Sequence, residues 1–147
     1  MFGADREVAE WVRRRINHMP SVDAMMPCVS IGVAKGGRFV AGLVYNNYRQ
    51  TDIQVTVAAD DKRWCTREVM RKVHHYPFIQ LGCLRVTCIV EEGNRPTLAF
   101  LEHWGFKREG VHPFLFPDGS AGVSLGLYRD RCRWLEAPHG QVNSRTA

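Results

Sequence analysis

Two segments of the chain carry residues whose types and spacing could do chemistry. The first, Asp61 to Arg67, places three basic side chains around the predicted start of a helix near Thr66. The first turn of a helix has unpaired backbone N–H groups and a partial positive charge, which suit a phosphate group. The second segment, from Glu91 to Thr97, begins with two carboxylates at the end of a predicted strand. A carboxylate in that position could remove a proton from a reacting group.

The composition limits the class of protein. The chain has 147 residues, of which 45% are hydrophobic and 24% charged, and this is typical of a single globular domain. No apolar run approaches the roughly 20 residues that span a bilayer. The N-terminal residues also lack the basic start and apolar stretch of a secretion signal. We therefore expect a cytoplasmic protein without a membrane partner.

Cysteine spacing and net charge restrict the ligands. The cysteines are odd in number and form no C-x-x-C pair, so we expect no metal site and five reduced thiols that pack mainly as small hydrophobic groups. They are Cys28, Cys65, Cys83, Cys88 and Cys132. The net charge of +5 favours anions such as a phosphorylated cofactor or a nucleic acid. A charge of this size does not by itself establish nucleic-acid binding.

The N-terminal half predicts a helix followed by an antiparallel meander. Apolar residues at three- and four-residue spacings predict a helix over residues 5–19, followed by a loop to residue 28. Alternating apolar residues predict strands near 29–34, 38–46 and 53–57, with Gly36 and Gly37 forming the first hairpin turn.

The C-terminal half predicts two helices and three strands. A helix over 66–76, ended by Pro77, should lead to a strand over 85–90 that is parallel to the preceding one. A second helix should run from Pro96 to Gly105, followed by strands over 106–116 and 121–129. Residues 1–135 are expected to form one domain, and residues 136–147 a disordered tail.

Local motifs resemble one known family. Asn94 and Thr97, then Gly105-Phe106 and Glu109-Gly110, are similar to the "N-x-x-S/A … L-G-F … E-G" segment of the GNAT (Gcn5-related N-acetyltransferase) superfamily. The element order agrees, and the resemblance covers roughly residues 30–134. Asp118-Gly119, followed by an apolar strand that ends in an Arg-rich stretch, resembles the same region of the ribosomal-protein and small-molecule acetyltransferase branch. The small size of the module also resembles phage and prophage members. The resemblance implies an α/β fold with a mostly antiparallel sheet of six to seven strands and helices on both faces.

The same resemblance implies an acetyl-CoA-dependent N-acetyltransferase that acts on a primary amine. The acceptor amine could belong to a small molecule, a peptide or a nucleic acid, and many relatives form homodimers. The strand containing Val57 and Ala58 should splay from its neighbour and bind the pantetheine arm through its backbone. The complete set of implied cofactor-binding residues is Val57, Ala58, Arg63, Trp64, Cys65, Thr66, Arg67, Asn94 and Thr97.

Two departures from the family pattern support an alternative. The segment Asp61–Arg67 contains no glycine, although the family's pyrophosphate loop uses glycines for close backbone approach. Basic side chains of Arg63 and Arg67 would have to substitute in part. Leu101 stands where relatives often have a tyrosine that protonates the leaving thiolate. The alternative is therefore a catalytically degenerate module that binds nucleic acid or a protein partner.

Few residues are candidates for the chemistry itself. Glu91 is our candidate for the catalytic base, and a solvated carboxylate at a strand end is the competing interpretation. His74, His75 and His112 are more typical of structural histidines, with one of the first two expected to face the sheet. Tyr76 could supply the missing phenol, although its helical position fits core packing better. With no Ser-His-Asp or Cys-His arrangement, we expect direct attack by the amine rather than a covalent acyl-enzyme.

Overall fold

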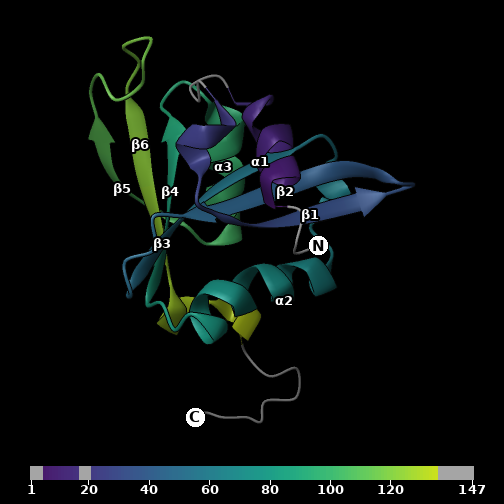
Figure 1. The fold of residues 1–147 in the computed structure, drawn as a ribbon. Coiled ribbons are helices and arrows are strands. Elements are labelled where there is room, and N and C mark those ends of the chain that lie inside the picture. Colours follow the sequence, from purple (N-terminus) through teal and green to yellow (C-terminus); the bar gives the residue numbers. More distant parts are fainter. Residues whose placement is uncertain (1–4, 17–20, 136–147) are drawn as a thin grey trace.

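A six-stranded mixed sheet forms the centre of the protein (Figure 1). The computed structural model describes residues 5–16 and 21–135, so the predicted tail at 136–147 lies outside the described residues. The strands are β1 (Val29–Lys35), β2 (Arg38–Asn46), β3 (Asp52–Ala59), β4 (Arg85–Glu91), β5 (Lys107–His112) and β6 (Gly122–Tyr128). Their order is β1-β2-β3-β4-β6-β5, and every neighbouring pair is antiparallel except β3 and β4. This arrangement confirms the predicted fold class.

The first helix covers one face of the meander. Helix α1 (Asp5–Arg13) packs Val8 and Val12 over β1 and β2. Gly42 permits this close approach, because a Cβ atom there would lie only 2.7 Å from Val12 Cγ2. The prediction of a helix over 5–19 was too long, since α1 ends at Arg13 and residues 17–20 lie outside the described residues.

The other two helices pack on the opposite face. Helix α2 (Arg67–His75) begins where Thr66 Oγ1 accepts a hydrogen bond from the Val69 N–H. Figure 1 shows α1 and α2 on opposite sides of β1 and β2. Helix α3 (Arg95–Trp104) ends at Gly105, whose φ of 127° suits a residue without a side chain. Both helix starts and this stop agree with the sequence prediction.

Proline affects two predicted boundaries differently. The segment after α2 continues as a π-helical turn over Tyr76–Gln80, so the prediction that Pro77 ends the helical segment was wrong. Pro77 has no N–H to donate to the Val73 carbonyl one turn earlier, and this carbonyl accepts a hydrogen bond from the Tyr45 hydroxyl at 2.7 Å instead. The predicted strand over 106–116 is also shorter. It ends at His112, because Pro113 cannot donate to the ladder and Phe114 turns the chain with a φ of 57°.

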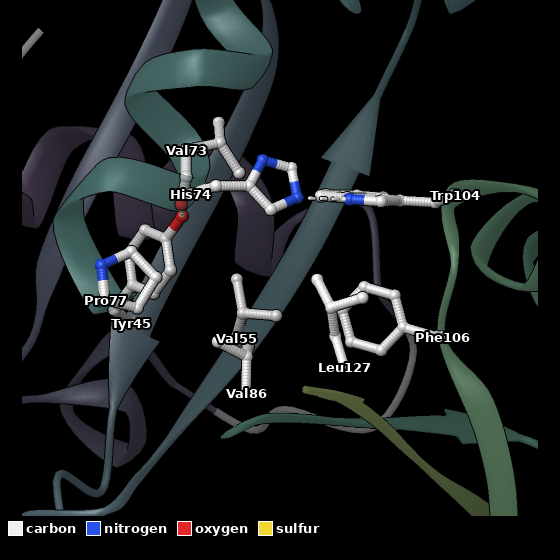
Figure 2. Close-up of a pocket in the computed structure, with 9 residues that line it drawn as sticks. All are labelled: Tyr45, Val55, Val73, His74, Pro77, Val86, Trp104, Phe106 and Leu127. Carbon is white, nitrogen blue, oxygen red and sulfur yellow. Dashed lines mark hydrogen bonds between the residues drawn. The ribbon is translucent and has the colours of Figure 1, made fainter. Parts of the chain in front are cut away.

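A buried histidine joins α2 to α3 (Figure 2). His74 is only 1% exposed. Its Nε2 atom must accept the hydrogen bond from the Trp104 indole, at 2.7 Å, because that indole can only donate. Nδ1 therefore carries the proton and donates to the Met70 carbonyl. Burial lowers the pKa of His74 to about 4, so the ring is neutral at physiological pH.

The cavity beside this histidine is too small to bind a ligand. Its volume is about 10 Å³, and apolar groups such as Val55, Val86 and Leu127 form most of its wall (Figure 2). The polar side chains at its edge are Tyr45, His74 and Trp104, and all three have hydrogen-bond partners. His74 is consequently a structural residue. The expectation that one of the two adjacent histidines faces the sheet is confirmed, since His75 is exposed.

Replacing Trp104 by Phe should destabilise the protein by about 1–3 kcal/mol, because His74 Nε2 would remain buried without a donor. The free energy of unfolding in urea measures this loss. Trp134→Phe is the matched control, since the buried Trp134 indole N–H has no hydrogen-bond partner among the described residues. Equal losses in the two variants would show that the hydrogen bond between Trp104 and His74 contributes nothing specific.

Candidate functional site

The parallel ladder between β3 and β4 is unusually short. It contains only the pairs Asp52–Arg85, Ile53–Val86 and Gln54–Thr87. Beyond these pairs, β3 remains paired with β2 as far as Ala59, and β4 remains paired with β6 as far as Glu91. Each strand is therefore held by its outer neighbour while the inner edges separate. The sheet is split between the second halves of β3 and β4.

A cleft of about 660 Å³ lies in this split. Consecutive residues 56–59 of β3 and 88–91 of β4 line it, so it receives side chains from both faces of the sheet. Arg15 and Ile16, just after α1, contribute on one face. On the other face, the segment before α2 and helix α3 complete the wall with Lys62, Trp64, Asn94, Pro96, Thr97, Ala99, Phe100, Leu101 and His103. The cleft therefore joins the two faces of the sheet.

Backbone groups of β3 face the split. The Asp60 N–H donates to the Val40 carbonyl at 2.8 Å, which directs the even-numbered amides of β3 toward β2. The odd-numbered residues therefore present their N–H and C=O groups to the split. The backbone of Val57 faces the cleft, whereas Ala58 contributes its side chain on the α1 face.

The glycine-free segment before α2 is held by its own side chains. Asp61 accepts hydrogen bonds from the Arg63 N–H and from the Arg63 guanidinium, which lowers the pKa of the Asp61 carboxyl. Trp64 is 1% exposed, and its ring centroid lies 6.2 Å from that of Phe100 and 6.0 Å from that of Trp104. The aromatic contact docks the segment onto α3.

The predicted phosphate-binding residues are only partly brought together. Trp64 lines the cleft, but Arg63, Cys65, Thr66 and Arg67 do not. Lys62, which is not among the predicted cofactor-binding residues, lines it instead. Among the described residues, no hydrogen-bond partner is found for the backbone N–H groups of Cys65, Arg67 and Glu68. These donors around the start of α2 fit a phosphate group.

The second predicted segment lies together at the cleft. Glu91, Asn94 and Thr97 all line it. Asn94 Oδ1 also accepts a hydrogen bond from the Thr97 N–H at 3.4 Å and so caps α3. Leu101 is buried at the cleft wall and offers no proton. Tyr76 is absent from the wall, because its ring packs against Tyr45 with the centroids 5.1 Å apart.

The thiols near the cleft are poor nucleophiles. Desolvation by burial raises the pKa of Cys88 to about 12 and that of Cys65 to about 11. All five cysteines are free, as predicted. In the described part of the chain, no three His, Cys, Asp or Glu residues are placed to hold a metal ion. None of its helices is long and apolar enough to cross a membrane.

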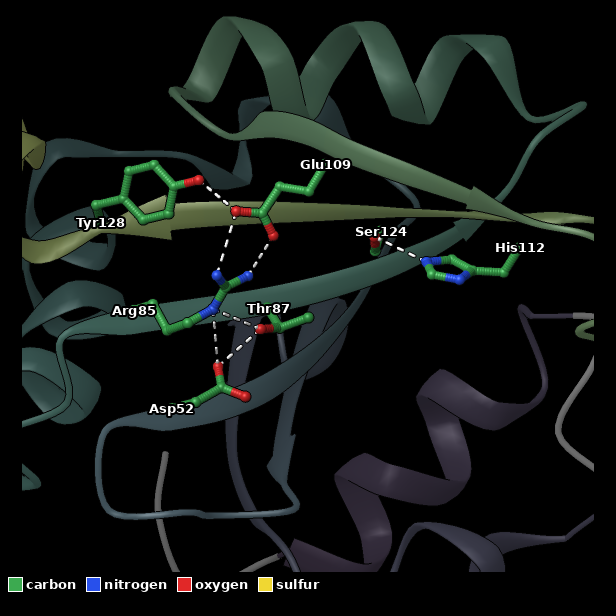
Figure 3. Close-up of polar contacts among 7 residues, drawn as sticks. All are labelled: Asp52, Arg85, Thr87, Glu109, His112, Ser124 and Tyr128. Carbon is green, nitrogen blue, oxygen red and sulfur yellow. Dashed lines mark hydrogen bonds and ion pairs between the residues drawn. The ribbon is translucent and has the colours of Figure 1, made fainter.

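A polar network closes the paired end of the split (Figure 3). At its centre, Arg85 donates to Thr87 Oγ1 at 3.1 Å and binds the Glu109 carboxylate. Thr87 donates to Asp52 at 2.7 Å, and the Tyr128 hydroxyl donates to Glu109. These residues come from β3, β4, β5 and β6. The network therefore connects four strands where the short ladder is still intact.

The fold and the split define the class of structure to which the protein is similar. No family model and no curated protein matches the chain. Solved structures do match, and they have the GNAT fold. A mutant of the spermidine N-acetyltransferase SpeG from Vibrio cholerae is 12% identical, with a TM-score of 0.68, over 90% of this chain and 93% of that one.

Two further structures support the same fold. The ribosomal-protein-S18-alanine N-acetyltransferase from Escherichia coli is 16% identical, with a TM-score of 0.61, over 87% of this chain and 90% of that one. A GNAT-family acetyltransferase from Bacillus anthracis is 15% identical, with a TM-score of 0.63, over 86% of this chain and 90% of that one. At these identities the comparison establishes the fold, and the resemblance inferred from the sequence motifs is consistent with it.

Glu109→Gln should lower the melting temperature at neutral pH, because it replaces the carboxylate partner of Arg85. The hydrogen bond from Arg85 lowers the pKa of Glu109 below its ordinary 4.5 in the folded protein. The carboxylate therefore contributes stability above pH about 4.5, and this contribution disappears as the pH falls through the folded pKa. We expect a difference of up to about 1 kcal/mol at pH 7 that shrinks in acid.

Thermal melts of both proteins from pH 7 to pH 3 test this expectation. Glu102→Gln is the control, since Glu102 pairs with Arg108 on the surface, away from the network. A difference between wild type and Glu109→Gln that stays constant over this pH range would contradict the assignment.

Proposed function

We propose that the protein is an acetyl-CoA-dependent N-acetyltransferase in which a primary amine attacks the thioester directly. The observation that carries the proposal is the cleft through the split sheet, because it joins two faces at the backbone of Val57. A donor entering from the α2–α3 face and an acceptor entering from the α1 face can meet there. The acceptor classes remain small amines, peptide amines and nucleic-acid-borne amines.

The α2–α3 face fits acetyl-CoA. The N–H groups around the start of α2 that have no partner in the described part of the chain, together with the Lys62 ammonium, suit its pyrophosphate. The exposed backbone of Val57 can pair with the amide groups of a pantetheine arm, as a neighbouring strand would. Asn94 and Thr97 line the same wall, while Arg63 and Arg67 act through their charge at longer range. When bound, acetyl-CoA would supply the activated carbonyl group.

The chain needs to contribute little further chemistry. Glu91 is positioned to take a proton from the incoming ammonium, which frees the lone pair that forms the new C–N bond. A backbone N–H facing the split can stabilise the negative charge that develops on the carbonyl oxygen. As the C–S bond breaks, the new amide nitrogen must lose its second proton and the leaving sulfur must gain one. Leu101 cannot provide a proton, so we assign this proton transfer to water.

The alternative is a GNAT-like module that binds a partner without catalysis, and the glycine-free segment favours it. Glycines would permit a closer approach of the backbone to the phosphates. Titration with acetyl-CoA separates the two proposals. Micromolar binding supports the enzyme, whereas no binding at millimolar concentration favours the module, and salt-dependent binding to nucleic acid would then identify one class of partner.

Lys62→Ala should weaken acetyl-CoA binding by about five- to tenfold, because it removes a charged donor worth roughly 1 kcal/mol or more. Isothermal titration gives the dissociation constant. Lys72→Ala provides a charge-matched control, since Lys72 lies on the exposed surface of α2 and does not line the cleft. Identical losses in both variants would indicate a general charge effect rather than a contact in the cleft.

Glu91→Gln should lower kcat by at least about 100-fold with little change in acetyl-CoA affinity, because the amide cannot accept the ammonium proton. Steady-state acetylation of a saturating amine measures kcat. Glu92→Gln is the control, since this adjacent carboxylate does not line the cleft. If Glu91→Gln retained wild-type kcat, Glu91 would be the solvated strand-end carboxylate of the competing interpretation.

A further inference from the structure

We infer that the acceptor is a monoamine whose amino group adjoins an apolar group, and that the protein discriminates against polyamines. This inference rests on the proposed function and concerns the face of the cleft that α1 shares. The first reason is the chemistry of that face. Side chains alternate along β3 and β4, so the residues that point to the α1 face are Thr56, Ala58, Ile89 and Glu91. Ile16, just after α1, completes this acceptor half.

The charges of the cleft disfavour a polycation. Among the described residues that line the acceptor half, Glu91 supplies the carboxylate and Arg15 is a cation. Arg15 is held in place, since its guanidinium binds both oxygens of Asp60 at 2.8 Å and stacks on the Trp11 ring. A polyamine carries several positive charges and needs several carboxylates, and like charges repel it. One carboxylate matches one ammonium group.

An apolar surface continues from the acceptor half to the hairpin between β5 and β6. A Cβ atom at Gly122 would lie 2.5 Å from Leu115, 3.2 Å from Phe116 and 3.3 Å from Ile89. These three side chains therefore converge over the glycine, and Ile89 is also part of the cleft wall. The Glu92 N–H donates to the Ala121 carbonyl at 2.9 Å, which holds the hairpin beside the end of β4.

The hairpin tip extends this surface into solvent. Phe114 is 86% exposed and has a φ of 57°, a conformation that a bulky side chain rarely adopts. Leu115 is 43% exposed. An acceptor with its ammonium at Glu91 would place the adjoining group against Ile89 and Leu115. An apolar group there would remove both side chains from water, which stabilises the complex. A hydroxyl or a second ammonium in the same place would lose its own hydration without gaining a hydrogen bond.

The test compares three primary amines as probes, which are 2-phenylethylamine, ethanolamine and spermidine. Each is titrated into protein saturated with CoA, and each is assayed for acetylation with acetyl-CoA by mass spectrometry of the product. We expect kcat/KM for 2-phenylethylamine to exceed both other values by at least about tenfold. Leu115→Ser should reduce this preference several-fold while the affinity for acetyl-CoA is retained. Leu84→Ser is the matched control, because Leu84 is 57% exposed and precedes β4, at the opposite end of that strand from Glu91.

The outcomes separate this inference from the proposed function. Acetylation of spermidine as efficiently as 2-phenylethylamine, or a preference unchanged by Leu115→Ser, would overturn the inference and leave the acetyltransferase proposal standing. Binding of acetyl-CoA without binding of any amine to the CoA complex would also overturn it. Failure to bind acetyl-CoA would overturn both.

Discussion

The three-residue ladder between β3 and β4 is the constraint on which the rest of the structure depends. A parallel pair would normally continue along both strands, and stopping it leaves inner-edge N–H and C=O groups without strand partners. The outer strands hold the two halves apart, while Arg85 and its partners hold them together at the paired end. The split therefore follows from the pairing of β3 with β2 and of β4 with β6. An extended ligand can pair with this backbone as a strand would, which is the role that we propose for a pantetheine arm.

Local chemistry made most of the elements predictable from the sequence. Gly36 and Gly37 have the positive φ angles that the predicted hairpin requires, and Thr66 and Gly105 delimit helices through contacts within a few residues. Predictions of element boundaries failed at prolines, because a proline can either begin a helical turn or end a helix or strand. Pro77 begins a further helical turn instead of ending one, whereas Pro113, followed by a left-handed Phe114, ends a strand early.

The candidate site was less predictable because it depends on side-chain direction. Glu91, Asn94 and Thr97 reach the cleft because they lie at the end of β4 and at the start of α3, and the motif sets the positions of both. In the segment before α2, the direction of each side chain depends on its contacts with residues elsewhere in the fold. Pairing with Asp61 holds Arg63 away from the cleft wall, while Lys62 reaches that wall. The network around Arg85 was missed because its partners, including Glu109, come from strands far apart in the sequence.

Trp64 explains how a segment without glycine can still present backbone donors. What a phosphate requires is outward-facing N–H groups, and glycine is one way to expose them. Here burial of one indole against Phe100 and Trp104 fixes the segment, and the N–H groups of Cys65, Arg67 and Glu68 are left without partners among the described residues. Trp104 in turn donates to His74 on α2. One aromatic cluster therefore sets the packing of both helices and the wall of the cleft. The geometry of the proposed donor site is consequently coupled to the core, and a substitution in the core can weaken binding without touching the ligand.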